Sequence, residues 1–440
     1  MANTSPLLLK QPFIYGRPVR ADEFLDRKNE VRAILNRLRN GESTAVVGEP
    51  HIGKSSLLQY LAHPSARQAN LGAEAEALIL SPLDLHPVGI DYTPALFWEE
   101  VLEPVLDLAE ADAELKAILA RLTESKYARR PLERLFNHLG GQGKRLVLLL
   151  DEFDVLLRHS NFQDASFFAL LRSLATRTGG LALVTASRLS VAEMNERGHG
   201  LLDTGSPFFN NSIEVRLRPF DEATVGALLD RGGERFSRDD RRIIRRVAGR
   251  HPFLLQAMSA ALLESEGEDR HVQAAETCYG RISFHFDDLW RSLDDATRTT
   301  AVILSLVELG GRALGREFAY GEIEGVDAFG PELTRLAERG LTEQVGEGWQ
   351  FDSEHLLLWR GARWTVGAQA FAWWVRDVVI AGSRQVPAYD EWLNDKRYRL
   401  LLTQEQWDGL VSVVQKAPDW AVRGVGGLAR ALVDELLKRK

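Results

Sequence analysis

The sequence predicts an α/β protein in which helices cover both faces of a parallel sheet, followed by smaller helical parts. Five short apolar runs alternate with amphipathic stretches in the first half of the chain. Residues 221–275 then show only helical patterns, and nine of the ten tryptophans lie from Trp290 onward. At 440 residues the chain is too long for one ordinary core, so we expect several domains.

The strand candidates are near-continuous apolar runs, which are typical of parallel strands buried on both faces. They are residues 43–47, 77–85, 145–150, 181–186 and 212–217. The helical stretch that follows the last strand predicts a small lid. We therefore assign residues 1–220 to the α/β domain and residues 221–285 to the helical lid.

The Trp-rich part predicts a third domain over residues 286–383. Residues 294–309 form a helical pattern that begins with an Asp cap and ends at Gly310 and Gly311. Residues 330–341 predict a second helix, and residues 342–352 predict a hairpin with Gly346 and Gly348 at its turn. Helices followed by a hairpin suggest a winged helix.

Residues 388–440 contain two further helical patterns, 403–416 and 427–440. Two interpretations of this segment stay open. It can be a helical hairpin that packs on the winged helix, or a small adaptor that recruits a separately encoded effector protein. The tryptophans at 359, 364, 373 and 374 are interpreted as core residues rather than a stacking platform.

Composition narrows the cellular setting. Apolar residues make up 45% of the chain and charged residues 26%, as in globular proteins, and the formal net charge is −8. The negative charge disfavours broad binding to nucleic acid or to anionic membranes. Cys278 is the single cysteine, so no intrachain disulfide can form. With no signal-like or membrane-spanning run in the sequence, we expect a cytoplasmic protein without a membrane partner.

A phosphate-binding loop follows the first predicted strand. Gly48, Gly53, Lys54 and Ser55 fit the pattern Gly-x4-Gly-Lys-Ser, with Ser56 next to it at the start of a helix. The glycines let the backbone approach a phosphate closely, and the helix N-terminus points N–H groups at the anion. Lys54 can bridge the β- and γ-phosphates, and the Ser55 hydroxyl can bind Mg²⁺. We expect ATP or ADP as the ligand.

A second motif lies at residues 145–154, where an apolar strand ends in Asp151 and Glu152. Carboxylates at the ends of parallel strands face the ligand crevice. We expect Asp151 to hold Mg²⁺ and Glu152 to polarise the attacking water. Asp154 is interpreted as a helix cap rather than a ligand.

Two groups of arginines leave alternatives open. Arg188 ends the fourth strand, where a cation can contact the γ-phosphate or can simply lie at the surface. The run from 237 to 251 is interpreted as a solvated basic helix face. The alternative is that one or two of its arginines reach the nucleotide or a neighbouring subunit. These arginines are Arg238, Arg241, Arg242, Arg245, Arg246 and Arg250.

The combination of motifs resembles the STAND branch of AAA-like P-loop ATPases, and in particular its prokaryotic members called archaeal-type ATPases. The resemblance rests on the two phosphate-site motifs, on "TASR" at 185–188, and on "GRHPFLL" at 249–255. It extends to the opening segment 11–31, to the stretch 206–223, and to 363–375. It implies a P-loop ATPase core, a lid and a winged helix.

The resemblance also implies residue roles. The backbone from Phe24 to Arg27 would border adenine. Pro252 would pack against the base, with His251 nearby. Arg188 would sense the γ-phosphate and take part in catalysis with Glu152 and Lys54. Such proteins are switches in signalling or defence, in which nucleotide controls opening and self-association.

We therefore expect a slowly hydrolysing ATP switch that acts on itself or on an effector protein. The alternative is a DNA-engaging winged-helix ATPase of the initiator or loader type. The sequence disfavours nucleic acid, because the 330–341 helix balances Arg335 and Arg339 against Glu332 and Glu338. The hairpin adds Glu343 and no cation within 342–352, whereas a phosphate-reading surface should be basic.

Overall fold

The computed structural model describes residues 11–25, 27–199, 212–298, 300–302, 304–305, 330–345, 348–351, 357–360, 363–381 and 424–438. The chain divides into two compact units. One runs from Arg17 to Leu217, and the other combines the N-terminal 16 residues with the chain from Arg218 onward. The predicted 220/221 boundary lies close to this division, although the first residues of the chain join the second unit.

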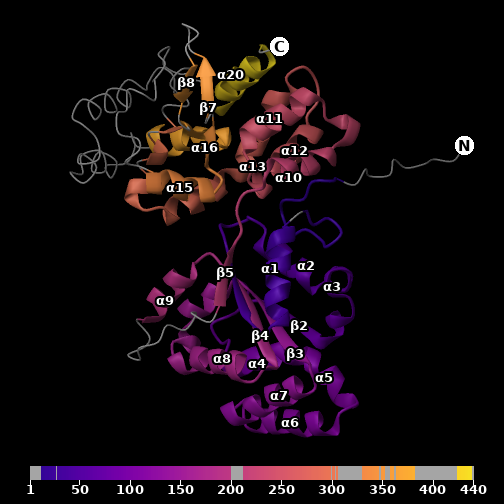
Figure 1. Cartoon of the computed structure of the whole chain (residues 1–440). Helices are drawn as coiled ribbons and strands as arrows, with labels where there is room; N and C mark the ends of the chain where they lie inside the picture. The colour runs from indigo at the N-terminus through magenta and orange to yellow at the C-terminus, as the bar shows by residue number, and fades with distance from the viewer. Residues whose placement is uncertain are drawn as a thin grey trace, which may run out of the picture. The chain divides into compact units, whose positions relative to one another are not determined.

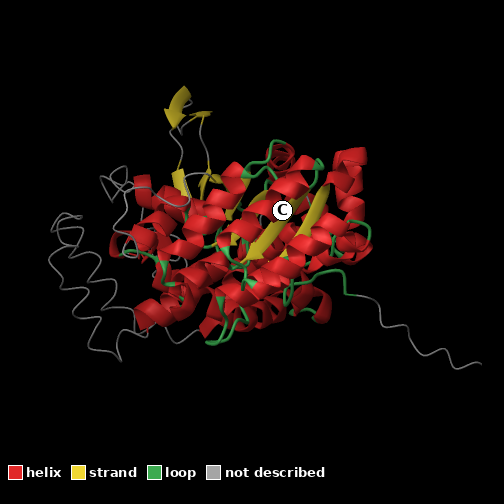
Figure 2. Ribbon diagram, turned by 90° about the horizontal axis from the view of Figure 1, so that it is seen from below, coloured by secondary structure: helices red, strands yellow, loops and turns green. Residues whose placement is uncertain are grey.

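The Arg17–Leu217 unit is built on a five-stranded parallel sheet with the order β2-β3-β4-β1-β5. Its helices surround the strands (Figures 1 and 2). The five predicted strands are confirmed, each within two residues at either end. Their bounds are β1 Ser43–Val47, β2 Leu78–Asp84, β3 Arg145–Asp151, β4 Leu181–Ser187 and β5 Ser212–Arg216.

The central strands β1, β3 and β4 are buried on both faces, as their apolar runs predict, whereas the edge strands β2 and β5 are partly exposed. Along β3, Leu146, Leu148 and Leu150 contribute to one hydrophobic cluster, whereas Val147 and Leu149 contribute to another. Successive side chains of a strand point to opposite faces, so each cluster belongs to one face. The helices of this unit are α1 Lys28–Arg39, α2 Lys54–Ala62, α3 Pro64–Leu71, α4 Pro94–Val101, α5 Glu103–Leu106, α6 Ala113–Glu124, α7 Arg129–Gly141, α8 Ala165–Arg177 and α9 Val191–His199.

The strand order determines which loops meet. Strand β4 lies between β1 and β3, and all three run in the same direction. Their carboxyl ends therefore lie side by side at one edge of the sheet. The phosphate-binding loop follows β1, Asp151 ends β3, and Arg188 follows β4. The topology alone brings these three segments together.

The second unit begins with the predicted lid, which consists of helices as expected. They are α10 Glu222–Asp230, α11 Arg238–Ala248, α12 Pro252–Glu264 and α13 Arg270–Ser292. Helix α13 continues through the predicted 285/286 boundary, because Ile282, Phe286 and Leu289 keep the helical spacing of buried residues.

The basic run lies on α11. Several of its arginines form hydrogen bonds or ion pairs within the unit, which differs from the solvated face that the sequence predicts. Arg245 donates to Glu222 at 2.6 Å and to Glu343 at 2.8 Å. Arg241 pairs with Asp230, and Arg242 donates to the Leu436 carbonyl at 2.9 Å. Helix α11 is therefore connected to other segments of this unit through its arginines. A capping box of Ser237 and Asp240 fixes its start.

The helix-and-hairpin part corrects one prediction. Helix α15 (Gly330–Glu338) is confirmed. At the start of the predicted 294–309 helix, Asp294 caps the first turn by accepting from the Thr297 N–H at 2.8 Å. However, 342–345 does not pair with 348–352. Strand β6 (Thr342–Val345) pairs with β9 (Arg363–Val366), and β7 (Gly348–Phe351) pairs with β8 (Leu357–Arg360).

The two strand pairs have the same antiparallel register, because Thr342 lies opposite Val366 and Gly348 lies opposite Arg360. The sequence prediction failed because glycines at 346 and 348 resemble a turn, whereas the pairing partner lies further along the chain. The predicted turn residue Gly346 and the predicted helix end at Gly310 and Gly311 fall outside the described residues.

The remaining described elements pack into the second unit. Helix α16 (Gln369–Trp374) continues into η9 (Val375–Ala381), and Trp373 and Trp374 are buried, which confirms their assignment to the core. Helix α20 (Gly424–Lys438) packs against α13 and α11 of the lid. The predicted helix 403–416 lies outside the described residues. No helix in the described part of the chain has the length and apolarity that a membrane span needs.

Candidate nucleotide-binding site

The loop between β1 and α2 has the backbone that a phosphate cradle needs. Gly53 has φ 107° and His51 has φ 60°, so the chain twice enters the left-handed region. A Cβ atom on Gly48 would lie 2.8 Å from the Ile52 Cγ2 atom and 3.1 Å from the Leu217 carbonyl oxygen. Only glycine fits at 48 without displacing the buried Ile52 side chain.

Lys54, at the start of α2, is 5% exposed. Its ammonium group donates to the carbonyl oxygens of Gly48 at 2.8 Å and Glu49 at 3.0 Å. Burial lowers the pKa of Lys54, and the carboxylates of Glu152, Asp151 and Glu49 partly oppose this shift. A buried ammonium group with neutral carbonyl partners is well placed for an anionic ligand.

The Ser55 hydroxyl acts to lower the pKa of Asp151, although the two residues are 96 positions apart in the sequence. Asp151 accepts a hydrogen bond from the Glu152 backbone N–H at 3.0 Å. Burial nevertheless raises the pKa of Asp151 above its usual value, despite the opposing effects of Ser55, of this hydrogen bond and of Lys54. The carboxylate is therefore held in a site where its charge is costly.

The donor set of Ser55 and Asp151 fits Mg²⁺, which prefers oxygen ligands and retains several waters. Among the described residues, no three His, Cys, Asp or Glu side chains gather as an all-protein metal site would require. A metal that is held mainly by phosphate and water needs only one or two protein oxygens. Ser55 and Asp151 would supply them, and Mg²⁺ would there offset phosphate charge.

Glu152 follows Asp151 with φ 50°, in the left-handed region. The Glu152 side chain is 21% exposed. The Arg188 guanidinium lies 3.8 Å from the Glu152 carboxylate and is itself half-exposed. The structure thus brings together Lys54, Ser55, Asp151, Glu152 and Arg188, all from the sheet edge that the topology selects. Their catalytic roles remain predictions.

The segment before α1 contacts the same loop. Arg27 is 8% exposed and donates to the Ile52 carbonyl at 3.3 Å. The Val19 N–H donates to the Ser56 hydroxyl at 3.1 Å, and Phe24 stacks on Tyr60 with ring centroids 4.5 Å apart. Arg27 and Ser56 therefore tie the N-terminal segment to the loop. That they also contact nucleotide stays a prediction.

The two lid residues that the sequence singled out lie in the other unit. His251 and Pro252 open α12, and His251 is fully buried, with its ring 4.9 Å from that of His285. Pro252 occupies the first position of the helix, where its missing N–H has no cost. The proposed contact of these residues with adenine remains a prediction.

The structure corrects the interpretation of Asp154 as a helix cap. It also shows that Asp154 contacts Ser187, a pair that the sequence did not suggest. Glu152, not Asp154, occupies the cap position of η3 (Phe153–Arg158), and no side chain caps that helix. Asp154 is 3% exposed and accepts from the Ser187 hydroxyl at 3.2 Å. Ser187 lies beside Arg188, but only the spatial adjacency of β3 and β4 shows that it meets Asp154.

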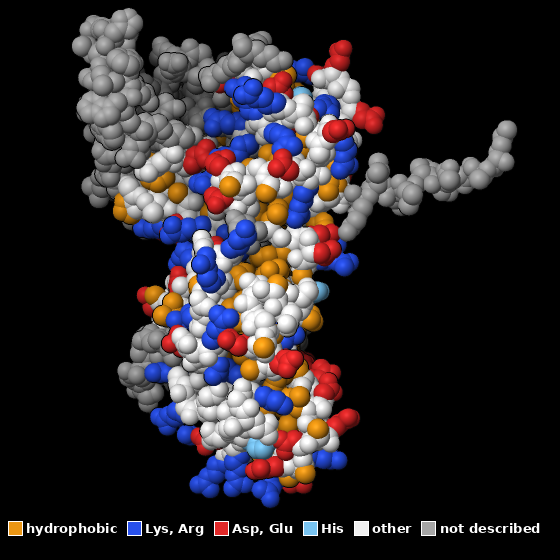
Figure 3. All heavy atoms as spheres, turned by 45° about the vertical axis from the view of Figure 1, so that its right-hand side comes forward, with side chains coloured by type: hydrophobic (Ala, Val, Ile, Leu, Met, Phe, Trp, Pro, Cys, Tyr) orange, Lys and Arg blue, Asp and Glu red, His pale blue; other side chains and the backbone are white. Residues whose placement is uncertain are grey.

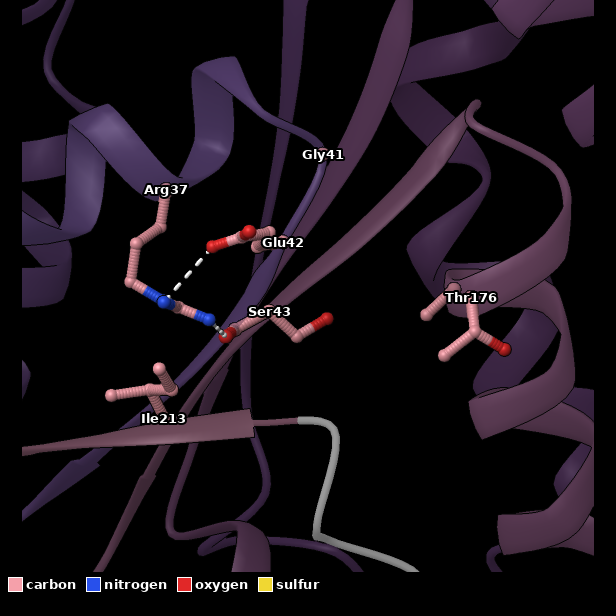
Figure 4. A pocket seen from close by; sticks show the side chains of 7 residues that line it. Arg37, Gly41, Glu42, Ser43, Thr176 and Ile213 are labelled. Atoms are coloured by element: carbon pink, nitrogen blue, oxygen red, sulfur yellow. Dashed lines mark hydrogen bonds and ion pairs between the residues drawn. The ribbon is translucent and has the colours of Figure 1, made fainter.

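A separate pocket of about 400 Å³ lies at the opposite end of β1, shown in Figure 4. Arg37 closes one side, paired with Glu42 and donating to the Ser43 carbonyl at 3.1 Å. Ser43 begins the strand that the phosphate-binding loop follows. This pocket is therefore distinct from the nucleotide site. Its lining residues are Arg37, Gly41, Glu42, Ser43, Ala175, Thr176 and Ile213.

Comparison with known families identifies the domain. The profile described as an AAA ATPase domain matches residues 23–185, and the profile described as an AAA-like domain matches residues 132–310. These spans contain the phosphate-binding loop, the Asp151–Glu152 pair and Arg188. The chain carries an AAA-like P-loop ATPase domain. Neither description names the STAND branch, so that finer assignment stays a prediction.

One solved structure supports the fold, and two further solved structures are more distantly similar to this chain. A Walker-type ATPase of Pyrococcus abyssi matches with a TM-score of 0.50 and 18% identity, over 82% of this chain and 98% of that chain. The ORC2 protein of Aeropyrum pernix gives a TM-score of 0.44 and 13% identity, over 85% and 98%. Cdc6p from Pyrobaculum aerophilum gives 0.34 and 14%, over 81% and 93%. A comparison with curated proteins found no match.

Proposed function

We propose that this chain binds Mg²⁺ and ATP at the loop from Gly48 to Ser55 and hydrolyses ATP there. The observation that carries the proposal is the position of Ser187 at the end of β4, where it is hydrogen-bonded both to Gly48 of the loop and to Asp154 in the turn after β3. These bonds join the two motifs into one site. Within that site the carboxylates of Glu152, Asp151 and Glu49 oppose the lowering of the Lys54 pKa by burial.

The residues divide the chemistry between them. Lys54 and the N-terminus of α2 bind the phosphates, and Ser55 with Asp151 binds the metal. Glu152 lies at the strand end that faces the ligand and accepts the proton of the attacking water as a base. Arg188 neutralises charge on the γ-phosphate and lies beside that base.

Phosphate release from ATP in the presence of Mg²⁺ tests this proposal. Glu152→Gln should retain nucleotide but lose turnover, and Lys54→Ala should lose nucleotide. Asp84→Asn is a matched control, because Asp84 lies opposite Asp151 at the end of β2 yet is exposed. It should keep both properties. Unchanged turnover in the Glu152 variant, or full nucleotide retention in the Lys54 variant, would contradict the assigned roles.

For the use of the ATP cycle, we favour engagement of duplex DNA over a slow switch acting on a partner protein. Helix α15 is followed by two antiparallel strand pairs, β6 with β9 and β7 with β8, and DNA-binding winged helices likewise place antiparallel strands after a helix. The switch reading, with a separately encoded effector, is the second candidate.

The two cations at the end of α15 and just after it are engaged in hydrogen bonds within the unit. Arg335 bonds to Asp294, and Arg339 donates to the Ser292 hydroxyl at 2.7 Å. Acidic and basic side chains are also interspersed on the face in Figure 3. DNA binding should therefore be weak and should respond to nucleotide rather than being constitutive.

A duplex-binding titration at several salt concentrations, with ATP or ADP, separates the two uses. DNA engagement predicts binding that weakens steeply as salt rises and that differs between the two nucleotides. Binding that is absent at low salt with either nucleotide would leave the switch as the function. Arg335→Ala together with Arg339→Ala should weaken binding if α15 contacts phosphate.

A further inference from the structure

The end of β4 is bonded to both neighbouring strands at the nucleotide site. The Gly48 N–H of the phosphate-binding loop donates to the Ser187 carbonyl at 3.3 Å. The Ser187 hydroxyl donates to Asp154 at 3.2 Å, in the turn that follows β3. Ser187 therefore holds the loop on one side and the turn that carries Glu152 on the other.

Ser187 and Asp154 are placed more rigidly than surface residues. They are 1% and 3% exposed. The Ser187 hydroxyl also accepts from the Leu189 N–H at 2.9 Å, which fixes its orientation so that its proton points to Asp154. The residue between Ser187 and Leu189 is Arg188. Two anchored neighbours thus define where the Arg188 side chain begins.

The turn after β3 is also anchored by a hydrogen bond. Glu152 and Asp154 are two residues apart, and Glu152 sits in a left-handed conformation at the start of η3. The bond between Asp154 and Ser187 links this turn directly to the strand end that carries Arg188. Across the link, the Arg188 guanidinium lies 3.8 Å from the Glu152 carboxylate.

We propose that Asp154 is a positioning residue which, through Ser187, sets Arg188 relative to Glu152 and so aligns the γ-phosphate contact with the catalytic base. This inference rests on the proposed function of Arg188 and Glu152. Asp154 contacts neither substrate nor metal. It acts as a hydrogen-bond acceptor for Ser187, and its negative charge is not what the role requires.

Asp154 has a second partner, and this makes it possible to test its acceptor oxygen and its negative charge separately. Arg158 donates to the other carboxylate oxygen at 3.2 Å, but its side chain is 61% exposed. An asparagine at 154 keeps the oxygen that accepts from Ser187 and loses the charge that attracts Arg158. Because Arg158 is exposed, it can turn to water. Asp154→Asn should therefore retain function, whereas Asp154→Ala should not.

Steady-state ATP hydrolysis by the full chain gives the main test. Asp154→Ala and Ser187→Ala should each lower kcat about tenfold with KM changed less than about twofold, because misplacement of a catalytic group costs rate rather than binding. Asp154→Asn and Arg158→Ala should stay within about threefold of the parent. The double variant Asp154→Ala with Ser187→Ala should be no slower than either single variant, because one contact is removed.

A second readout does not need turnover. The affinity for a non-hydrolysable ATP analogue, divided by the affinity for ADP, measures contact with the γ-phosphate. Ser187→Ala and Asp154→Ala should lower this ratio, and Asp154→Asn should not. If the parent protein binds nucleotide without hydrolysing it, the proposed hydrolysis fails and this ratio alone decides the positioning role.

Three results would overturn the inference. The first is an Asp154→Asn variant as impaired as Asp154→Ala, which would assign the role to charge. The second is a Ser187→Ala variant with unchanged kcat and unchanged affinity ratio. The third is a loss of kcat, affinity and thermal stability in proportion, which would mean that the pair only supports the fold.

Discussion

Replacing Asp151 with asparagine should stabilise the folded protein at neutral pH while removing its ATPase activity. Burial raises the pKa of Asp151, which means that the folded chain binds its proton more tightly than the unfolded chain. Ionised Asp151 therefore costs folding free energy above the folded pKa and costs none below the unfolded pKa. Asparagine carries no charge at any pH, so it avoids this cost.

The structure limits the size of the gain. An asparagine oxygen can still accept from the Glu152 N–H, so this hydrogen bond is kept. The attraction of Lys54 is lost, which offsets part of the relief. We expect a net gain of about 1 kcal/mol, in the range of other substitutions that relieve a functional site. That corresponds to about 2–4 °C in the unfolding temperature of a unit of this size.

Urea unfolding without nucleotide or metal, at neutral and at mildly acidic pH, measures the effect. The advantage of Asp151→Asn should be largest at neutral pH and should shrink as pH falls through the folded pKa of Asp151. Asp84→Asn, at the exposed neighbouring strand end, should change stability by less than about 0.5 kcal/mol. An Asp151→Asn variant that is less stable than the parent at neutral pH would refute the reasoning, as would a difference that does not depend on pH.

Two further predictions concern the loop and the lid. Gly48→Ala places a Cβ atom 2.8 Å from a buried isoleucine methyl group and should cost about 1–3 kcal/mol and most nucleotide affinity. Gly226→Ala, on α10 with nothing within 4 Å, should instead stabilise by about 0.5–1 kcal/mol in the same unfolding and titration experiments. Glu343→Ala removes a 16%-exposed carboxylate from Arg245 and should destabilise the second unit by about 1–2 kcal/mol. Glu222→Ala removes the 67%-exposed partner of the same arginine and should cost less than about 1 kcal/mol. Equal losses for the two glutamates would contradict the assignment of Glu343 as the stronger contact.

The sheet and the centre of the site were predictable because their signals are local. The central strands are nearly continuous apolar runs, and the glycines, Lys54 and Ser55 stand at fixed spacing in a short segment. Asp151 and Glu152 follow a strand directly, which is enough to place them at the ligand edge of a parallel sheet.

What the sequence did not reveal depends on contacts between distant segments. The pairing of Asp154 with Ser187 spans 33 positions and follows from β4 lying beside β3, which no local pattern encodes. The hairpin was misplaced because glycines at 346 and 348 resemble a turn, whereas β6 pairs with β9 and β7 pairs with β8. The lid boundary at 285 rested on composition, although buried residues at helical spacing carry α13 on to Ser292.

The most direct test of the central claim is phosphate release from ATP by the parent protein and by Glu152→Gln, with bound nucleotide measured in the same samples. The account predicts Mg²⁺-dependent turnover in the parent, and a variant that keeps ATP bound without hydrolysing it. Turnover that persists in the variant would contradict the account. So would a parent protein that binds no nucleotide.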